Sequence, residues 1–268
     1  MEEVDLRRVV GAFLATEPLG DVLGLDEDAA LVFAQAFTRQ DEEPAQPPRL
    51  YTGLCRGSYA NLFANVLSTW KTTRRNPLHE LQDVPMENFD EDKTSFNHIM
   101  AILPTSVDNL TNDITSIASF VKAIGGARGL LTLIGVRCTV GSQVICPPTR
   151  EQCLEAFNRR HTTSSKHSVM TVGARQWTKH VERSSDRWWG VNKGSEAVKN
   201  NLAKAKIDEL MDSAVWVNVH GLPNGPVVYE IRQAEGYGAR WGFQGNDVHF
   251  RGFIEPYLEN GHEVGWKH

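Results

Sequence analysis

The chain has 268 residues, of which 41% are hydrophobic and 23% charged, and its formal net charge is −5. These fractions are typical of a globular protein and exclude disordered, collagen-like and membrane-spanning classes. No apolar run approaches the roughly 20 residues that cross a bilayer, and the acidic first residues lack the basic segment of a signal peptide. We therefore expect a soluble protein that is cytoplasmic or nuclear, is not secreted and has no membrane partner.

The first 46 residues are strongly acidic, with eleven Asp or Glu against three Arg. Apolar residues recur at steps of three and four over 6–14 and 27–39, which predicts two amphipathic helices. Residues 40–49 contain three prolines and three acids and read as an exposed connector. We expect residues 1–46 to be a separate acidic helical hairpin that can dock a protein partner, followed by a single α+β domain over 50–268.

Further helical patterns follow the connector. Ser58 is well placed to cap a helix from Tyr59 to Trp70, and Pro104 is expected to end a short helix over 94–103. Residues 106–124 predict one long amphipathic helix that stops at Gly125. The segment 128–138, "RGLLTLIGVRC", is apolar enough to be a buried strand or a buried helix, and its periodicity does not decide between them.

Helices are predicted near 150–159, 172–183 and 196–214, and the hydrophobic period then changes from helical to two. Residues 215–220 and 227–233 alternate as strands, and Asn224-Gly225 between them is a hairpin signal. Two more strands, near 239–243 and 248–255, extend the hairpin. The fold class is therefore α+β: the N-terminal two thirds are mainly helical, and a three- to four-stranded antiparallel meander packed on helices forms the C-terminal part.

Gly236 and Gly238 open the segment "GYGARW", which begins like a dinucleotide fingerprint. The third glycine is missing and a strand follows, whereas a Rossmann site needs a helix N-terminus, so that site is excluded. Two interpretations remain. The glycines form a backbone anion nest beside Arg240, or they form a tight turn.

The helix 172–183 places Arg175, Lys179 and Arg183 on one face, and Trp188 and Trp189 follow at once. Interleaved cations and aromatic rings are typical of surfaces that grip phosphates and stack on bases. The alternative is an ordinary solvated charged face with the tryptophans in the core.

The polar face of the predicted hairpin is the third candidate. Alternation places His220, Glu230 and Arg232 on one face, where Arg251 can join them from the last strand. A histidine beside a glutamate suits proton transfer, and arginines suit an anionic substrate. Solvent exposure or plain ion pairing is the alternative, although Trp216 on the same face indicates that the face is covered. His180 is a further candidate base on its helix, and residues 257–268 are expected to dock back on the body.

Three functions remain open. The first is an enzyme that acts on a phosphate- or carboxylate-bearing small molecule by acid/base chemistry without a covalent nucleophile. The second is a nucleic-acid or anion-binding module that uses the basic helix and tryptophans, and the third is a protein-interaction scaffold. The four cysteines match no zinc spacing, and we expect neither metal nor cofactor. The predicted catalytic residues are His220, Glu230 and His180, and the predicted substrate-binding residues are Arg175, Arg240, Arg251, Gly236, Gly238 and Trp188.

Overall fold

A computed structural model describes residues 6–40, 50–84, 91–107, 110–111, 113–162, 167–183, 187–222, 225–245 and 247–256. The chain forms two compact units. Unit 1 comprises Met1–Tyr51, Cys55–Leu81 and Asp90–Thr149, and unit 2 comprises Thr52–Leu54, Gln82–Phe89 and Arg150–His268. The predicted domain boundary at residues 46–50 stays a prediction, because most of the connector lies outside the described residues.

Unit 1 is helical. Its elements are α1 (Leu6–Leu14), α2 (Gly20–Leu23), α3 (Glu27–Thr38), α4 (Tyr59–Thr73), the 3-10 helix η1 (Pro77–Glu80), α5 (Thr94–Ser106), α6 (Ile114–Ala123) and α7 (Gly126–Leu133). The apolar stripes predicted for α1, α3 and α4 form its core, and α1 packs on α4 and α6. Ser58 caps α4 as predicted, since its side chain accepts from the Asn61 N–H.

Two helix boundaries in unit 1 differ from the prediction. Helix α5 continues through Pro104 to Ser106, because a proline in the last turn removes only one backbone hydrogen bond from a helix that is about to end. The long helix predicted over 106–124 is wrong. Helix α6 begins only at Ile114, where Asp113 accepts from the Ser116 N–H and caps it. The ambiguous segment after Gly125 is helical as far as Leu133.

Among the described residues, no single helix has the length and apolar character to cross a membrane. Helices α6 and α7 meet that test only when taken together, and they are bent by 91° at the break between them.

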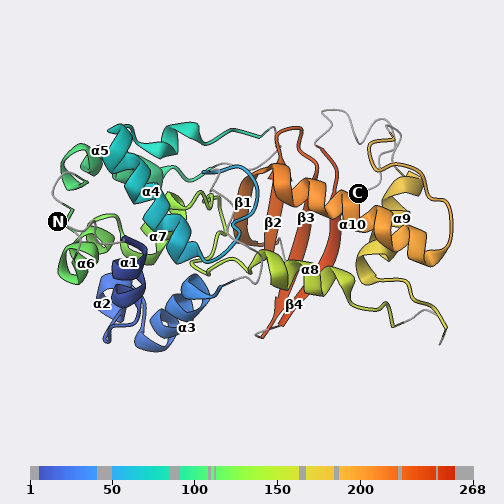
Figure 1. Cartoon of the computed structure of the whole chain (residues 1–268), viewed down its shortest axis with the longest axis horizontal. Helices are drawn as coiled ribbons and strands as arrows, with labels where there is room; N and C mark the ends of the chain where they lie inside the picture. Colours follow the sequence, from blue (N-terminus) through green and yellow to red (C-terminus); the bar gives the residue numbers. More distant parts are fainter. Residues whose placement is uncertain are drawn as a thin grey trace. The chain divides into compact units, whose positions relative to one another are not determined.

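Unit 2 places three helices before a sheet: α8 (Arg150–Asn158), α9 (Val172–Arg183) and α10 (Glu196–Ser213). The strands are β1 (Ala214–Gly221), β2 (Val227–Gln233), β3 (Gly238–Gln244) and β4 (Asp247–Ile254), paired antiparallel in the order β1-β2-β3-β4. Figure 1 shows α8 and α10 lying across the sheet. This architecture confirms the predicted α+β class with a C-terminal antiparallel meander packed on helices.

The two faces of the sheet differ in chemistry because successive side chains of a strand point to opposite sides. The apolar face carries Val219, Ile231 and Trp241, which pack with Trp177 of α9 and Ile207 of α10 in one buried core. The polar face is the other side, and it carries Trp216, Asn218, His220, Val228, Glu230, Arg232, Gly238, Arg240, Gly242, Gln244, Asp247, His249, Arg251, Gly252 and Ile254. The helices of unit 2 thus cover the apolar face, and the polar face is where the candidate site lies.

Helix α9 approaches α8 at Gly173, and this contact yields a stability prediction. A Cβ added there would lie 2.2 Å from Cζ of the buried Phe157 ring, so Gly173→Ala must displace a core side chain. We expect a loss of about 1–3 kcal/mol in the free energy of unfolding, measured by urea denaturation.

Gly11→Ala is the matched control. A Cβ added at Gly11 in α1 meets nothing within 4 Å, and alanine favours a helix over glycine by about 1 kcal/mol. Gly11→Ala should therefore keep or raise stability. A Gly173→Ala variant as stable as the parent chain would contradict the described packing of α8 on α9.

Candidate nucleic-acid site on the polar sheet face

The middle of the polar face is a row of residues that face one another across the strands. Asn218 of β1 pairs with Glu230 of β2, which pairs with Arg240 of β3. Trp216 pairs with Arg232 in the next row. Asn218 and Glu230 are fully buried. The hairpin register predicted from Asn224-Gly225 therefore brings the predicted polar residues together, although Asn224 itself lies outside the described residues.

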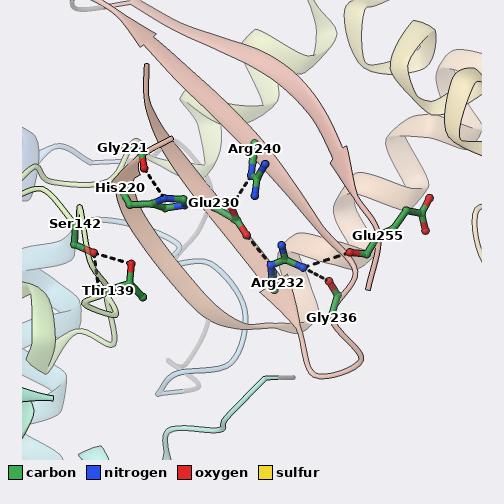
Figure 2. A network of polar contacts seen from close by, with 9 residues as sticks. All are labelled: Thr139, Ser142, His220, Gly221, Glu230, Arg232, Gly236, Arg240 and Glu255. Atoms are coloured by element: carbon green, nitrogen blue, oxygen red, sulfur yellow. Dashed lines mark hydrogen bonds and ion pairs between the residues drawn. The ribbon is translucent and has the colours of Figure 1, made fainter. Parts of the chain in front are cut away.

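Glu230 is the centre of this row because three cationic or imidazole donors converge on its carboxylate (Figure 2). Arg232 Nε donates to Oε1 at 2.6 Å, and Arg240 Nε donates to Oε2 at 2.5 Å. His220 Nε2 lies 3.1 Å from Oε2. An ionised carboxylate only accepts, so Nε2 of His220 carries a proton in this contact.

The same contacts fix the ionisation of Glu230. Burial by itself would raise the pKa of this carboxyl group, but the hydrogen bond from His220 and the charges of Arg232 and Arg240 outweigh it and lower the pKa to about 2. Glu230 is therefore a permanent anion at neutral pH. Both of its oxygens accept hydrogen bonds, and the side chain is fully buried.

Arg232 joins the cluster to the turn between β2 and β3. Its Nη1 donates to the carbonyl of Gly236 at 2.8 Å and to the carbonyl of Glu255 at 3.4 Å (Figure 2). The N–H of Gly236, whose φ is 94°, donates to the carbonyl of Gln233. A Cβ at Gly238 would lie 2.2 Å from the Ile231 carbonyl oxygen. The geometry is that of a tight turn in which the Gly236 N–H is already used.

A second polar cluster lies beside the first, around the carboxylate of Glu255. His180 Nδ1 of α9 lies 3.0 Å from Glu255 Oε1, and Trp189 Nε1 donates to the same oxygen at 2.6 Å. The side chain of Glu255 points away from Arg232 (Figure 2). His180 is therefore held by Glu255 and not by Glu230, and aromatic contacts with Trp189 and Phe253 pack its ring.

The basic helix does not line the polar face. Ala174 and Trp177 hold α9 against the apolar face, so this helix packs on the side of the sheet opposite the polar residues. Arg175 is exposed on the outer side of the helix. Trp188 stacks on Tyr237 at 4.0 Å between centroids, and Lys206 Nζ lies 3.9 Å over the same ring. At these distances both faces of the Trp188 ring are occupied.

The accessible part of the polar face lies on β3 and β4. The Arg240 side chain is 28% exposed, and Arg251 is exposed. His249 faces Gly242 across the strands and is half-buried next to Arg251. His249 was not among the residues predicted from the sequence, although its place two residues before Arg251 puts both on one face of a strand. Asp247 at the start of β4 is already paired with Arg159, at 2.6 and 2.7 Å.

In the part of the chain that the structure describes, no three His, Cys, Asp or Glu side chains are grouped to hold a metal ion. The four cysteines are free thiols, and burial raises the pKa of Cys146.

Fold and site together define a class: a helix-covered antiparallel meander whose opposite face carries a buried glutamate contacted by two arginines and one histidine. A sequence profile of the CdiA C-terminal tRNase toxin domain matches residues 160–255, which is 96 of the 268 residues. The match lies within unit 2 and spans α9, α10 and all four strands. Comparisons with curated proteins and with solved structures give no match.

This similarity corrects two expectations. The prediction of an enzyme that acts on an anionic small molecule is wrong, because the matched profile points to nucleic acid. Nucleic-acid binding was the alternative prediction. The expectation of a cytoplasmic or nuclear, non-secreted protein is also wrong, because a similarity to toxin domains does not fit a protein that stays in the compartment where it is made. The prediction of a possible nucleic-acid partner agrees with the comparison, which indicates a nucleic acid.

The lowered pKa of Glu230 predicts a pH dependence of stability. The pKa falls from an ordinary 4.5 to about 2 on folding, so its stabilisation is complete above pH 4.5 and is lost as the pH falls towards 2. The shift corresponds to about 3 kcal/mol at 1.36 kcal/mol per unit. We expect the difference in unfolding free energy between the parent chain and Glu230→Gln to shrink over this window in urea denaturation.

Glu235→Gln is the control, since this exposed residue of the β2–β3 turn allows the loss of one carboxylate to be measured outside the cluster. A constant difference between the parent chain and Glu230→Gln from pH 5 to pH 2.5 would show that Glu230 is not an anion held by its neighbours.

Proposed function

We propose that unit 2 is a ribonuclease domain that cleaves tRNA, and that the polar sheet face is its active surface. The observation that carries the proposal is the match to the tRNase toxin domain over residues 160–255. That span contains Glu230 together with its donors His220, Arg232 and Arg240, and it also contains His249 and Arg251. The similarity and the polar cluster thus fall on the same part of the chain.

The charge of the polar face supports this proposal. Among the described residues at the centre of the face, Arg232, Arg240 and Arg251 are positively charged and Glu230 is negatively charged. With His220 and His249 counted as neutral, this leaves an excess of two positive charges. A surface of this sign attracts phosphate groups, and guanidinium groups match their geometry. The chain as a whole is acidic, so the positive field is local to the site.

Glu230 has a positioning role in this account. Its carboxylate binds Nε of both arginines, which leaves their terminal nitrogens to face outward or to bind backbone carbonyls. Two nitrogens of Arg232 are used inside the fold, so its role is structural. Arg240 is partly exposed and is the member of the cluster that can contact a phosphate. His220 is buried against Glu230 and holds that carboxylate in place.

The outer face of α9 is a second surface for the same substrate. Arg175, Lys179 and Arg183 lie at positions i, i+4 and i+8, and cations on one helix face bind RNA phosphates without reading sequence. This surface would add affinity, whereas the polar sheet face would carry the chemistry.

Docking of a protein partner on residues 1–46 stays a prediction. Five of the eleven acids of this segment are described, and three of them already have partners within unit 1. Asp21 pairs with Lys122, Asp26 caps α3, and Glu27 accepts from the N–H groups of Leu19 and Gly20.

Arg240→Ala tests the proposed activity. We expect the purified full chain to cut tRNA into discrete fragments on a denaturing gel. Arg240→Ala should lower the rate at saturating tRNA by about 10²-fold or more, the usual effect of removing one preorganised donor to the reacting group. Arg8→Ala, at an exposed position of α1 outside the matched span, is the control and should cleave at the parent rate. Absence of cleavage by the parent chain would contradict the proposal.

Replacing Arg175, Lys179 and Arg183 together by alanine tests the second surface. We expect weaker tRNA binding with an unchanged cleavage rate at saturation, because these groups bind phosphates away from the reacting centre. The slope of log affinity against log salt should fall by about one for each phosphate that the helix no longer neutralises. An unchanged slope, measured by fluorescence anisotropy, would remove α9 from the interface.

A further inference from the structure

One group on the polar face has no role in the cluster around Glu230. His249 of β4 lies in a row with His220, Val228 and Gly242, one residue from each strand. A Cβ added at Gly242 would lie 2.4 Å from both Cε1 and Nε2 of the His249 ring. The imidazole therefore lies directly over the backbone of Gly242, in space that a side chain would fill.

The ring is not fixed there by polar contacts. His249 Nδ1 is buried and has no hydrogen-bond partner among the described residues. A buried polar atom without a partner costs about 1–3 kcal/mol, and such atoms are rare enough to need an explanation. Packing over Gly242 places the ring, so its nitrogens are not committed to neighbouring side chains as those of His220 and His180 are.

A β-bulge brings two arginines together next to this ring. Trp241 pairs with Phe250, whereas Arg240 pairs with Gly252, so Arg251 and Gly252 both lie opposite Arg240. The position of a Cβ at Gly242 is also 3.1 Å from Cδ of Arg251, which places that side chain beside His249. Like charges opposite one another on neighbouring strands are unfavourable. Glu230 is engaged by Arg240, and Arg251 has no acidic partner in the described parts of the chain, so a bound anion would balance this pair.

The charges around His249 keep its ring neutral. Burial lowers the pKa of His249, and Arg251 lowers it further. Asp247 on the same strand acts in the opposite direction, but Asp247 is paired with Arg159 of α8, which also lowers the pKa of His249. A neutral imidazole can accept a proton, and adjacent guanidinium groups can hold the phosphate next to it.

We propose that Arg240, His249 and Arg251 form the subsite for the reacting phosphate of an RNA substrate, with His249 as its catalytic proton acceptor. This inference rests on the proposed ribonuclease function and adds the residues that would touch the reacting atoms. Nε2, over Gly242, is the nitrogen assigned to the proton transfer, because Nδ1 is buried.

The chemical step needs only groups of the substrate, the protein and water. The ribose 2′-hydroxyl gives its proton to His249 as its oxygen bonds to the neighbouring phosphorus, and the bond from phosphorus to the 5′-oxygen breaks. Water protonates the leaving 5′-oxygen, and the hydroxide formed takes the proton back from His249. The products are a 2′,3′-cyclic phosphate and a 5′-hydroxyl end. Arg240 and Arg251 stabilise the negative charge that develops on the phosphate oxygens.

Two substitutions separate the role of His249 from a structural one. His249→Gln removes the proton acceptor, and Gly242→Ala keeps every catalytic group but pushes the ring away with its added Cβ. We expect both to lower the cleavage rate at saturating tRNA, His249→Gln by about 10²–10⁴-fold, with tRNA affinity within twofold of the parent. The fall of the parent rate at acidic pH should disappear in His249→Gln. A His249→Gln chain that is folded and cleaves at the parent rate would overturn the subsite while leaving the ribonuclease proposal intact.

A measurement without catalysis covers the case in which the parent chain does not cleave tRNA or the variants do not fold. Inorganic phosphate is titrated into the parent chain and into Arg251→Ala, and the Cε1–H resonance of His249 is followed by NMR. We expect a saturable shift in the parent chain that is weakened or absent in Arg251→Ala. No shift in the parent chain, or the same shift in both chains, would overturn the subsite irrespective of the activity on tRNA.

Discussion

The polar sheet face depends on the buried carboxylate of Glu230. Removing a charge from water is costly, and this site is stable because His220, Arg232 and Arg240 supply three donors from neighbouring positions of β1, β2 and β3. Leaving the buried His220 or Arg232 without this acceptor would be strongly unfavourable. The cluster therefore fixes the register of three strands and the orientation of the Arg240 side chain. Through Arg232, which donates to the Gly236 carbonyl, it also fixes the β2–β3 turn.

The apolar face of the sheet stabilises the fold, whereas the polar face carries the charged groups. The apolar face is filled by tryptophans and phenylalanines against α8, α9 and α10, which gives the strands a rigid support. The polar face can then hold charges at defined positions, from the fully buried Glu230 on β2 to the exposed Arg251 on β4. This gradient of burial is suited to a binding surface, since the inner charges orient the outer ones and only the outer ones meet the ligand.

The sequence predicted most of this architecture, because hydrophobic periodicity is a local signal. The change of period at Val215, the Ser58 cap and the alternation that places His220, Glu230 and Arg232 on one face were all readable from spacing. The start of α6 was missed because apolar spacing continued across residues 106–113, and the capping geometry of Asp113 decided the boundary. Spacing predicted that the meander packs on helices, but it did not show which helix covers which face of the sheet.

In the candidate site too, features with a local sequence signal were predicted, and features that depend on tertiary packing were missed. Strand alternation placed Glu230 on one face with His220 and Arg232, whereas nothing local showed that α9 packs on the opposite face with Trp177 inward. His249 was missed because its setting arises from a glycine seven residues earlier in sequence, on the adjacent strand, and from a bulge at Arg251. The function was misassigned for a related reason: a basic and histidine-bearing face fits any phosphate, and its chemistry alone does not distinguish a small anion from RNA.

If RNA binds to the β3–β4 side of the polar face, hydrogen–deuterium exchange of the full chain with and without tRNA will show it. We expect protection on tRNA binding in peptides covering residues 238–254, with the hairpin of β1 and β2 changing less. Protection confined to unit 1, or no protection anywhere at a tRNA concentration that saturates binding, would contradict it.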